Sequence, residues 1–550
     1  MNRRDSLMLL FKKQKKNALK QKQIKSSNFT NTAFTRYAGE WGFEQAAHLL
    51  RRTTFGPKLA EIKQAVDDGL ESTVSLLFED QPLPAPPVYF DFKNDPNAAL
   101  GETWVDAPLY DIQGLRAARR RSLFAWTFKL FKDSKVNITE KMTLFWHNHF
   151  VTSAINSPRR VYRYITFLRE NALGNFRELA KGITIDPAML QYLNGTQNSK
   201  KSPNENYSRE LLELFTIGKG DLVAPGDYTN YTEDDVVALA RALTGWRHVN
   251  FDDRSKIESV FIPRRHDTGE KQLSARFNNT VITNGGENEY KNVIDIIFQQ
   301  DEVARFICRK LYRWFVHFDI NSEVETNIIE PMSQMLIADN YEIKGALMAL
   351  LSSEHFYDIS IRGCMITHPI DFLFKIIRTF DLAFPTDYRM EYFILARIFR
   401  TTEPLEMVMY YPPNVAGWKA FYQAPQYYKT WISAVTLPIR MEIADVFVDG
   451  FKVRQFPVQL NVLEFAAALD NPNDPNDLIN GMASILFAQK LSETQVAALK
   501  DILIPGLPDF EWTVEYVKYI EGDTSLEPAI EKQLQALVKA MLKMPEFYLI

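Results

Sequence analysis

The chain has 550 residues, of which 46% are hydrophobic and 13% aromatic, so it can bury at least one substantial core. A formal net charge of −4 excludes a strong overall attraction to nucleic acid, and no apolar run approaches the ~18 residues of a membrane-spanning helix. Two cysteines, Cys308 and Cys364, are too few for a disulfide framework and match no zinc-binding spacing. The composition therefore predicts a soluble globular protein that suits a reducing compartment.

The first 25 residues differ in charge from the rest of the chain. They contain nine Lys or Arg and one acid, a net charge of +8, which leaves −12 for the remainder. Arg3 and Arg4 are typical of a twin-arginine export signal, but the apolar run 7–11 is too short for the hydrophobic region of such a signal. We predict that residues 1–40 form a basic, disordered head and that the protein is cytoplasmic. The alternative is export to the periplasm or cell envelope through a degenerate twin-arginine signal.

Helical periodicity dominates from about residue 43 onward. The stretch FEQAAHLLRRTTFGP repeats apolar residues at helical spacing and stops at Gly56-Pro57, and ARFICRKLYRWFVHF carries an apolar stripe on one helical face. The predicted fold class is mainly α. We expect one large multi-helix globular domain over residues 41–456 and a C-terminal helical subdomain over residues 457–550 that packs on it.

Three segments interrupt the helical pattern. The proline-rich segment 81–97 and the turn-rich segment 218–232 predict long connections. The next helix is predicted to begin at Thr232, with Asp235 three residues after this cap. Between about 248 and 290 the pattern turns polar and β-permissive, which predicts a small β-containing insertion.

Residues 137–150 place two of the eight histidines on one predicted helix. Asn137 as the N-cap, with Glu140 three residues later, predicts that the helix starts here. On a regular helix His149 lies on the apolar, aromatic face and His147 faces the other way, so the two imidazoles cannot share one metal ion. His149 is the inward candidate, and it is either a core histidine bonded to a backbone carbonyl or a residue of a functional site.

A second helix carries a carboxylate of interest. The stretch SPNENYSRELLELFTIGKG predicts a helix from the N-cap Ser202 to Gly218, with Glu210 at the edge of the apolar face and Arg209 opposite that face. A carboxylate at the edge of an aromatic face can have a raised pKa and act as an acid or base, or bind a metal. The alternative is that Glu210 pairs with an arginine between packed helices.

Two loops carry further candidates. In RRHDTGEK, His266 stands beside Asp267 with Arg264 nearby, a set that can hold an anion or serve acid–base chemistry, or that forms only a solvated charged loop. In YYPPNVAGWKAF, two prolines stiffen a loop that presents Asn414 and Trp418, which can line a pocket or fill the core.

Several common catalytic and nucleotide-binding motifs are absent from the sequence. No GxSxG, HExxH, phosphate-binding GxxxxGK[ST] or dinucleotide-binding GxGxxG motif occurs in the chain. The usual hydrolase, metalloprotease, nucleotidase and Rossmann-fold assignments therefore lack their signals.

Six long stretches nevertheless form a specific pattern over nearly the whole chain after residue 40. They are HLLRRTTFGP (48–57), FWHNHF (145–150), NYSRELLELFTIG (206–218), YTEDDVVALARALTGW (231–246), RRHDTGEK (264–271) and PPNVAGW (412–418). In this order, and with the closing MPEFYLI, they resemble the bacterial domain-of-unknown-function 1800 family. The resemblance implies a largely helical bacterial protein, often encoded beside a sulfatase-like family and often exported by the twin-arginine route. It names no reaction, cofactor or catalytic residue.

Two functions stay open at this point. The first is an enzyme of hydrolase or group-transfer type with a His/carboxylate pocket. Its predicted residues are His149, Glu210, His266 and Asp267 for catalysis, and Arg209, Arg264, Asn414 and Trp418 for substrate binding. A divalent metal such as zinc or manganese on these imidazoles and carboxylates is a further hypothesis. The second function is a non-catalytic binding or assembly partner of a sulfatase-like protein or an envelope polymer. No nucleic-acid partner is predicted.

Overall fold

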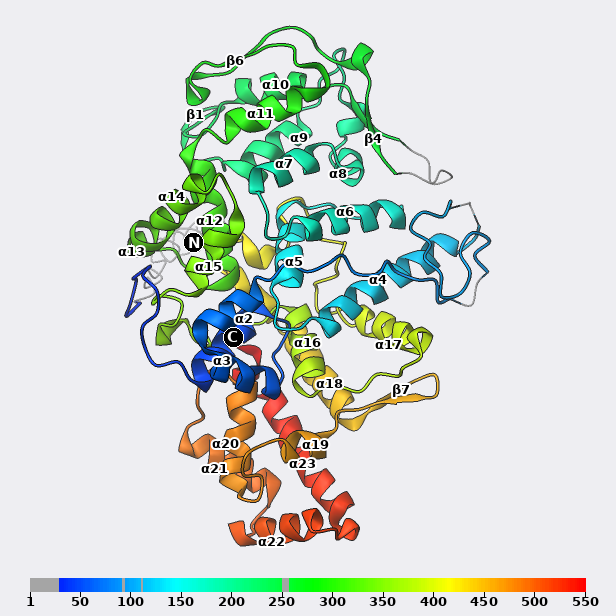
Figure 1. Ribbon diagram of the computed structural model, residues 1–550, viewed down its shortest axis with the longest axis vertical. Helices are drawn as coiled ribbons and strands as arrows, with labels where there is room; N and C mark the ends of the chain where they lie inside the picture. Colours follow the sequence, from blue (N-terminus) through cyan, green and yellow to red (C-terminus); the bar gives the residue numbers. More distant parts are fainter. Residues whose placement is uncertain (1–28, 92–93, 110–111, 250–256) are drawn as a thin grey trace, which may run out of the picture.

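The computed structural model describes residues 29–91, 94–109, 112–249 and 257–550, and it is mainly helical, as predicted (Figure 1). The first helices are α2 (Phe43–Thr53), α3 (Leu59–Leu77), α4 (Leu115–Asp133), α5 (Thr139–His149), α6 (Pro158–Glu170), α7 (Phe176–Thr184), α8 (Pro187–Tyr192), α9 (Asn206–Glu210) and α10 (Glu233–Ala242). The middle of the chain forms α11 (Glu289–Ile297), α12 (Asp301–Phe315), α13 (Ser322–Val324), α14 (Glu330–Ala338), α15 (Ile343–Leu351), α16 (Pro369–Thr379), α17 (Tyr388–Arg400) and α18 (Thr436–Asp449). The last helices are α19 (Val462–Ala467), α20 (Pro475–Leu486), α21 (Glu493–Leu503), α22 (Asp509–Ile520) and α23 (Glu527–Lys543).

Short helical turns connect these helices. Two are π-helices, η2 (Leu211–Thr216) and η6 (Glu325–Ile329). The 3-10 turns are η1 (Gly195–Gln197), η3 (Pro263–Arg265), η4 (Ala275–Phe277), η5 (Gly286–Asn288), η7 (Ile359–Ile361), η8 (Lys419–Phe421), η9 (Tyr427–Trp431), η10 (Thr524–Leu526) and η11 (Pro545–Tyr548).

In the part of the chain that the structure describes, every sheet is an antiparallel pair of short strands. The pairs are β1 (Leu222–Ala224) with β2 (Asp227–Tyr228), β3 (Trp246–His248) with β4 (Ser259–Phe261), β5 (Lys271–Gln272) with β6 (Val281–Ile282), and β7 (Phe451–Val453) with β8 (Phe456–Val458). The pairs β3–β4 and β5–β6 form the predicted insertion, which begins at Trp246 and leads into α11.

Figure 1 shows an elongated molecule with α7–α11 and the strands β1–β6 at one end and α19–α23 at the other. The last residues of the chain return to the middle of the molecule, where the backbone N–H of Thr367 donates to Tyr548 O at 2.8 Å. The division at residue 457 stays a prediction. Residues 1–28, which include most of the basic head, lie outside the described residues. Within the described ranges, no helix has both the length and the apolar character needed to cross a membrane.

The helices α5 and α16 form the centre of the molecule, and every residue of both is buried. Because α5 has neighbours on all sides, His147 and His149 are 0% and 3% exposed, respectively. The prediction that His147 faces away from the core is therefore wrong. The start of α5 is close to the expected one, since Asn137 Oδ1 accepts the backbone N–H of Thr139 at 2.9 Å.

The predicted helix starts differ in accuracy. Thr232 and Asp235 form the expected capping box on α10, with the Asp235 carboxylate accepting the Thr232 backbone N–H at 2.8 Å. The predicted N-cap Ser202 is wrong, because α9 begins at Asn206. Asn198 Oδ1 accepts the Asn204 backbone N–H at 2.9 Å and holds this segment in a turn, so the helix starts three residues later than predicted.

Candidate functional site

His149 lies in a network with the π-turn η2 and with α12. Its Nε2–H donates to Phe215 O at 2.9 Å, and its Nδ1 accepts from Lys310 Nζ at 3.2 Å. Burial and the nearby ammonium group lower the pKa of His149 well below its ordinary value, so the imidazole is neutral at pH 7. These contacts are those of a core histidine bonded to a backbone carbonyl, and its catalytic role stays a prediction.

The Lys310 amine beside His149 is more unusual. It is half-buried and also donates to Leu214 O at 2.9 Å. Burial, with a smaller effect of Arg313, lowers the pKa of Lys310 to about 7. A lysine with this pKa is partly neutral at physiological pH, which is the form that can act as a base or nucleophile.

Glu210 and Arg209 do not pair with each other. Arg209 binds Glu205 at 3.0 Å and Glu233 at 2.7 Å. Glu210 is half-buried, and in the described part of the chain its carboxylate has no hydrogen-bond or ion-pair partner. Burial and the charge of Glu213 raise the pKa of Glu210. The structure thus keeps Glu210 as an unpaired carboxylate of raised pKa, and its predicted role stays open.

His266 belongs to a buried ion cluster in the insertion. Its Nε2 lies 3.0 Å from Glu289 Oε2, and its Nδ1 lies 2.9 Å from Thr244 O. Lys271 Nζ also binds the Glu289 carboxylate, and both of these side chains are fully buried. Because each charge has a partner, the cluster ties the β5–β6 hairpin to α11.

The other loop residues lie apart from this cluster. Asp267 pairs with Arg241 at 2.7 Å, and this contact lowers the pKa of the Asp267 carboxyl. Arg264 is exposed. Among residues 29–550, outside the undescribed gaps, no three His, Cys, Asp or Glu side chains are arranged to hold a metal ion. His149, Glu210, His266 and Asp267 are thus not part of such a group in the described residues, and the zinc or manganese hypothesis stays a prediction.

The loop after Pro413 fills the core rather than a pocket. Trp418 is 1% exposed, its backbone N–H donates to Asn148 Oδ1 at 3.0 Å, and its ring lies 5.8 Å from the His147 ring. Asn414 is exposed, and its Nδ2 donates to Tyr422 Oη at 2.6 Å. Of the two alternatives for Trp418, the core position is the one observed.

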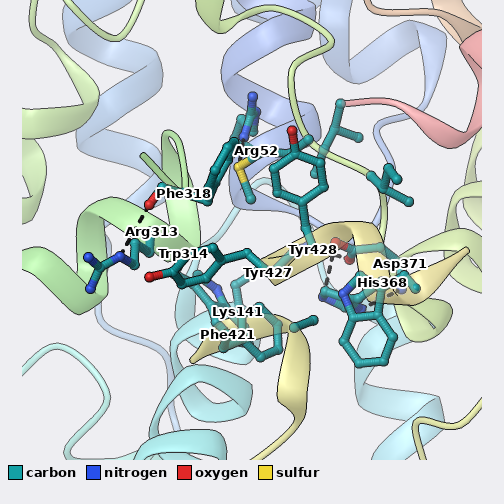
Figure 2. A pocket seen from close by; sticks show the side chains of 15 residues that line it. Arg52, Lys141, Arg313, Trp314, Phe318, His368, Asp371, Phe421, Tyr427 and Tyr428 are labelled. Atoms are coloured by element: carbon teal, nitrogen blue, oxygen red, sulfur yellow. Dashed lines mark hydrogen bonds and ion pairs between the residues drawn. The ribbon is translucent and has the colours of Figure 1, made fainter. Parts of the chain in front are cut away.

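The structure brings a different set of charged residues together, around a small cavity of about 20 Å³ that Figure 2 shows. Its charged and polar residues are Arg52 on α2, Lys141 on α5, Arg313 on α12, His368 before α16 and Asp371 on α16. Its aromatic walls are Trp314, Phe318, Phe421, Tyr427, Tyr428 and Trp431. A cavity of this size holds a group as large as one water molecule.

The sequence THPIDF places His368 and Asp371 at the start of α16. His368 is the N-cap, Pro369 follows it, and the imidazole Nδ1 accepts the backbone N–H of Asp371 at 3.1 Å. In the neutral imidazole the proton is then on Nε2. This atom lies 3.0 Å from Asp371 Oδ2 but makes no aligned hydrogen bond with it.

Lys141 joins the two central helices. Its Nζ binds Asp371 Oδ1 and lies 4.7 Å from the centre of the Phe55 ring. Burial lowers the pKa of Lys141 and lowers the pKa of His368 to about 3. At neutral pH the imidazole is therefore uncharged, and the polar centre consists of this imidazole, the Lys141 ammonium group, the Asp371 carboxylate and the guanidinium groups of Arg52 and Arg313.

Arg52 approaches the same cavity from α2 and is 3% exposed. Its terminal nitrogens donate to Val316 O at 3.1 Å and Ile361 O at 2.7 Å, and they contact two sulfur atoms. Its Nε–H has no acceptor among the described residues, and the Nε2–H of His368 makes no aligned hydrogen bond although Asp371 Oδ2 lies 3.0 Å away. Leaving a buried donor unpaired costs roughly 1–3 kcal/mol, so an oxygen acceptor in the cavity would be stabilised by both groups.

None of these five charged and polar residues was predicted as part of a site. Arg52 stands inside HLLRRTTFGP and Lys141 stands just before FWHNHF, but each looks like an ordinary charge on a helix. The dipeptide His368-Pro369 can be recognised in the sequence as the start of a helix. No local pattern links residues 52, 141 and 368, because only packing brings them together.

A comparison with known protein families identifies the chain. The model described as "Protein of unknown function (DUF1800)" matches residues 48–549. The chain belongs to this family. No curated protein shows significant similarity to it. The same is true of the solved structures.

Two motif glycines of this DUF1800 protein explain how its motifs hold the central helices. Gly417 has φ +92°, and a Cβ added there would lie 2.3 Å from Asn148 Oδ1 on α5. Gly56 has φ +97°, and an added Cβ would lie 2.6 Å from the Cα of Lys375 on α16. Only glycine allows this backbone conformation together with such close approach, so PPNVAGW packs on α5 and HLLRRTTFGP on α16.

Proposed function

We propose that this protein binds a ligand through a carboxylate or phosphate oxygen placed in the aromatic cavity. The observation that carries the proposal concerns two buried side chains in the lining of one cavity: the Nε–H of Arg52 has no acceptor among the described residues, and the Nε2–H of His368 makes no aligned hydrogen bond with Asp371. Arg52 and Arg313 carry positive charges in the same lining, whereas the Lys141 ammonium group is paired with the Asp371 carboxylate. Donors and charge in a buried, aromatic environment favour an anionic oxygen, because both interactions are stronger than in bulk water.

The size of the cavity determines how such a ligand would enter. About 20 Å³ fits only the oxygen-bearing group. Tyr427 and Tyr428 on η9 are half-buried and line the cavity. The proposal therefore requires these two side chains to rotate outward, so that the body of the ligand lies against aromatic rings.

Binding fits the polar centre better than acid–base catalysis does. A general base is most effective when its pKa is near the working pH, and His368, with a pKa of about 3, is a weak base at pH 7. Its Nε2–H can still donate a hydrogen bond. The same groups can therefore recognise an oxygen without transferring a proton.

Fluorescence titration tests the proposal, because Trp314 and Trp431 line the cavity. Benzoate, acetate, phenyl phosphate and inorganic phosphate are the probes, and we expect saturable quenching by at least one of them. The variant Arg52→Gln should weaken binding by about tenfold, which corresponds to about 1.4 kcal/mol. The matched control Arg264→Gln changes an exposed arginine outside the cavity and should bind normally.

A second readout covers the case in which Arg52→Gln does not fold. Tyr427→Ala opens the cavity from its half-exposed side and should speed association of the same probe. No saturable quenching by any probe, or equal association rates for Tyr427→Ala and the parent protein, would contradict the proposal.

The second candidate function is an enzyme of hydrolase or group-transfer type. The contact between Lys310 and His149, with a lysine pKa of about 7, favours it. Limited labelling with trinitrobenzenesulfonate at pH 7, followed by peptide mapping, tests it. Lys310 should react faster than Lys490, which is exposed and whose pKa is raised by Glu44. Slower labelling of Lys310 would remove the support for this candidate.

The predicted partner and compartment stay proposals. A sulfatase-like protein or an envelope polymer would be a partner under the binding proposal, and the cytoplasmic location rests on the short apolar run in the basic head. Intact-mass spectrometry of native protein tests the location. Loss of about the first 25 to 35 residues together with recovery from the periplasm would reverse it.

A further inference from the structure

A second, larger cavity of about 590 Å³ lies between α2, η7 and the end of α20. Its apolar lining consists of Phe43, Ile359, Ala483, Phe487, Ala488 and Leu491. Small-molecule sites usually measure about 300–1,000 Å³ and have mainly apolar walls with a few polar groups. In size and lining this cavity matches such a site.

The charges in its wall are unbalanced. Arg51, Arg362 and Lys490 line the cavity together with one acid, Glu44. Glu44 binds Arg362 at 2.7 Å and Lys490 at 2.9 Å, so two cations share one carboxylate. Arg51 donates to Ser484 O at 2.5 Å and to Ile485 O at 3.1 Å, and in the described residues it has no carboxylate partner. The wall therefore carries a net charge of +2.

The two arginines are also deeply buried. Arg51 is 6% exposed and Arg362 is 8% exposed, and the Nε–H of each has no acceptor among the described residues. Burial, with a smaller effect of the like charge of Arg362, lowers the pKa of Arg51 to about 10. An anion bound near both guanidinium groups in the cavity would offset their like charges.

We propose that this cavity binds an amphiphilic carboxylate, a carboxylate head on an unbranched apolar chain. The head lies at Arg51 and Arg362, where planar guanidinium groups match a planar carboxylate. The chain lies along the apolar wall formed by η7 and the end of α20. This site is separate from the aromatic cavity of the proposed function and does not depend on it.

Isothermal titration calorimetry of the full chain with sodium decanoate tests this proposal. We expect one site per chain. Decanol and decylamine, which share the apolar chain but lack a negative charge, should bind at least about tenfold more weakly. Decanol binding as tightly as decanoate would overturn the proposal. Tighter binding of decyl phosphate would overturn the choice of a carboxylate head.

Variants locate the site. Ala488→Phe fills the cavity from a half-buried position and should abolish decanoate binding without lowering the thermal midpoint of the free protein. Ala99→Phe, the same change at an exposed alanine outside the cavity, is the matched control and should bind normally.

Two further variants test the role of charge. Arg362→Met should remove the preference for decanoate over decanol, whereas Lys490→Gln at the exposed rim should change it little, because exposed charges are screened by water. Normal decanoate binding by Ala488→Phe, or an unchanged preference in Arg362→Met, would refute the site.

Discussion

Lowering the pH from 7 to 5 is expected to destabilise this protein, because its buried histidines cannot take up protons in the folded state. Burial lowers the pKa of His147 and of His368 to about 3. In the unfolded chain both groups titrate near 6.5, so their contribution to stability is present above that pH and is lost as the pH falls towards 3. At about 1.4 kcal/mol per pH unit, each histidine loses about 2 kcal/mol of stability by pH 5. The pair loses about 4 kcal/mol, a large part of the 5–15 kcal/mol typical of a domain.

Urea unfolding at pH 7, 6 and 5, followed by far-ultraviolet circular dichroism, measures this loss. The variant His147→Gln should be less stable at pH 7 but should lose about 2 kcal/mol less between pH 7 and 5.

His266→Gln is a control with the opposite expected pH dependence. Burial by itself would lower the pKa of His266, but the bond to Glu289 outweighs it, and the pKa is raised. This histidine therefore adds stability below pH 6.5, and that stability is lost as the pH rises through the pKa of the folded state. Equal pH dependence in His147→Gln and the parent protein would refute the reasoning.

Three further predictions concern buried contacts. Asp371→Leu leaves the Lys141 charge unpaired in the core and should cost about 3–5 kcal/mol in urea unfolding, whereas adding Lys141→Met should restore most of that loss. Gly417→Ala, with φ +92° and an oxygen 2.3 Å from the new Cβ, should lower the thermal midpoint more than Gly506→Ala, where φ is +68° and the space is open. Glu289→Gln should destabilise the insertion by about 3 kcal/mol and make it sensitive to limited proteolysis, and unchanged cleavage would contradict its role as the anchor of that cluster.

Local signals predicted the helical fold well. The mainly-α class, the β-containing insertion and the capping box at Thr232 were all readable from the sequence. Each depends on interactions between residues close in sequence, such as apolar periodicity or a side chain that binds a backbone N–H three residues away. Ser202 failed as a helix start because Asn198 holds the following segment in a turn, and the strength of such a competing bond cannot be read from a capping pattern.

The family membership was also determined by the sequence alone, since ordered motifs need no coordinates. The polar centre was decided only by the tertiary structure. Arg52, Lys141 and His368 come from three helical regions that are far apart in the chain, and each acquires its unusual environment from neighbours that no local pattern specifies. Likewise, the sequence of α5 predicts a helix with one buried face, but other elements cover the helix on every side. His147 is therefore as buried as His149. Periodicity describes one helix, whereas burial, and with it the pKa of a side chain, depends on all the helices packed around it.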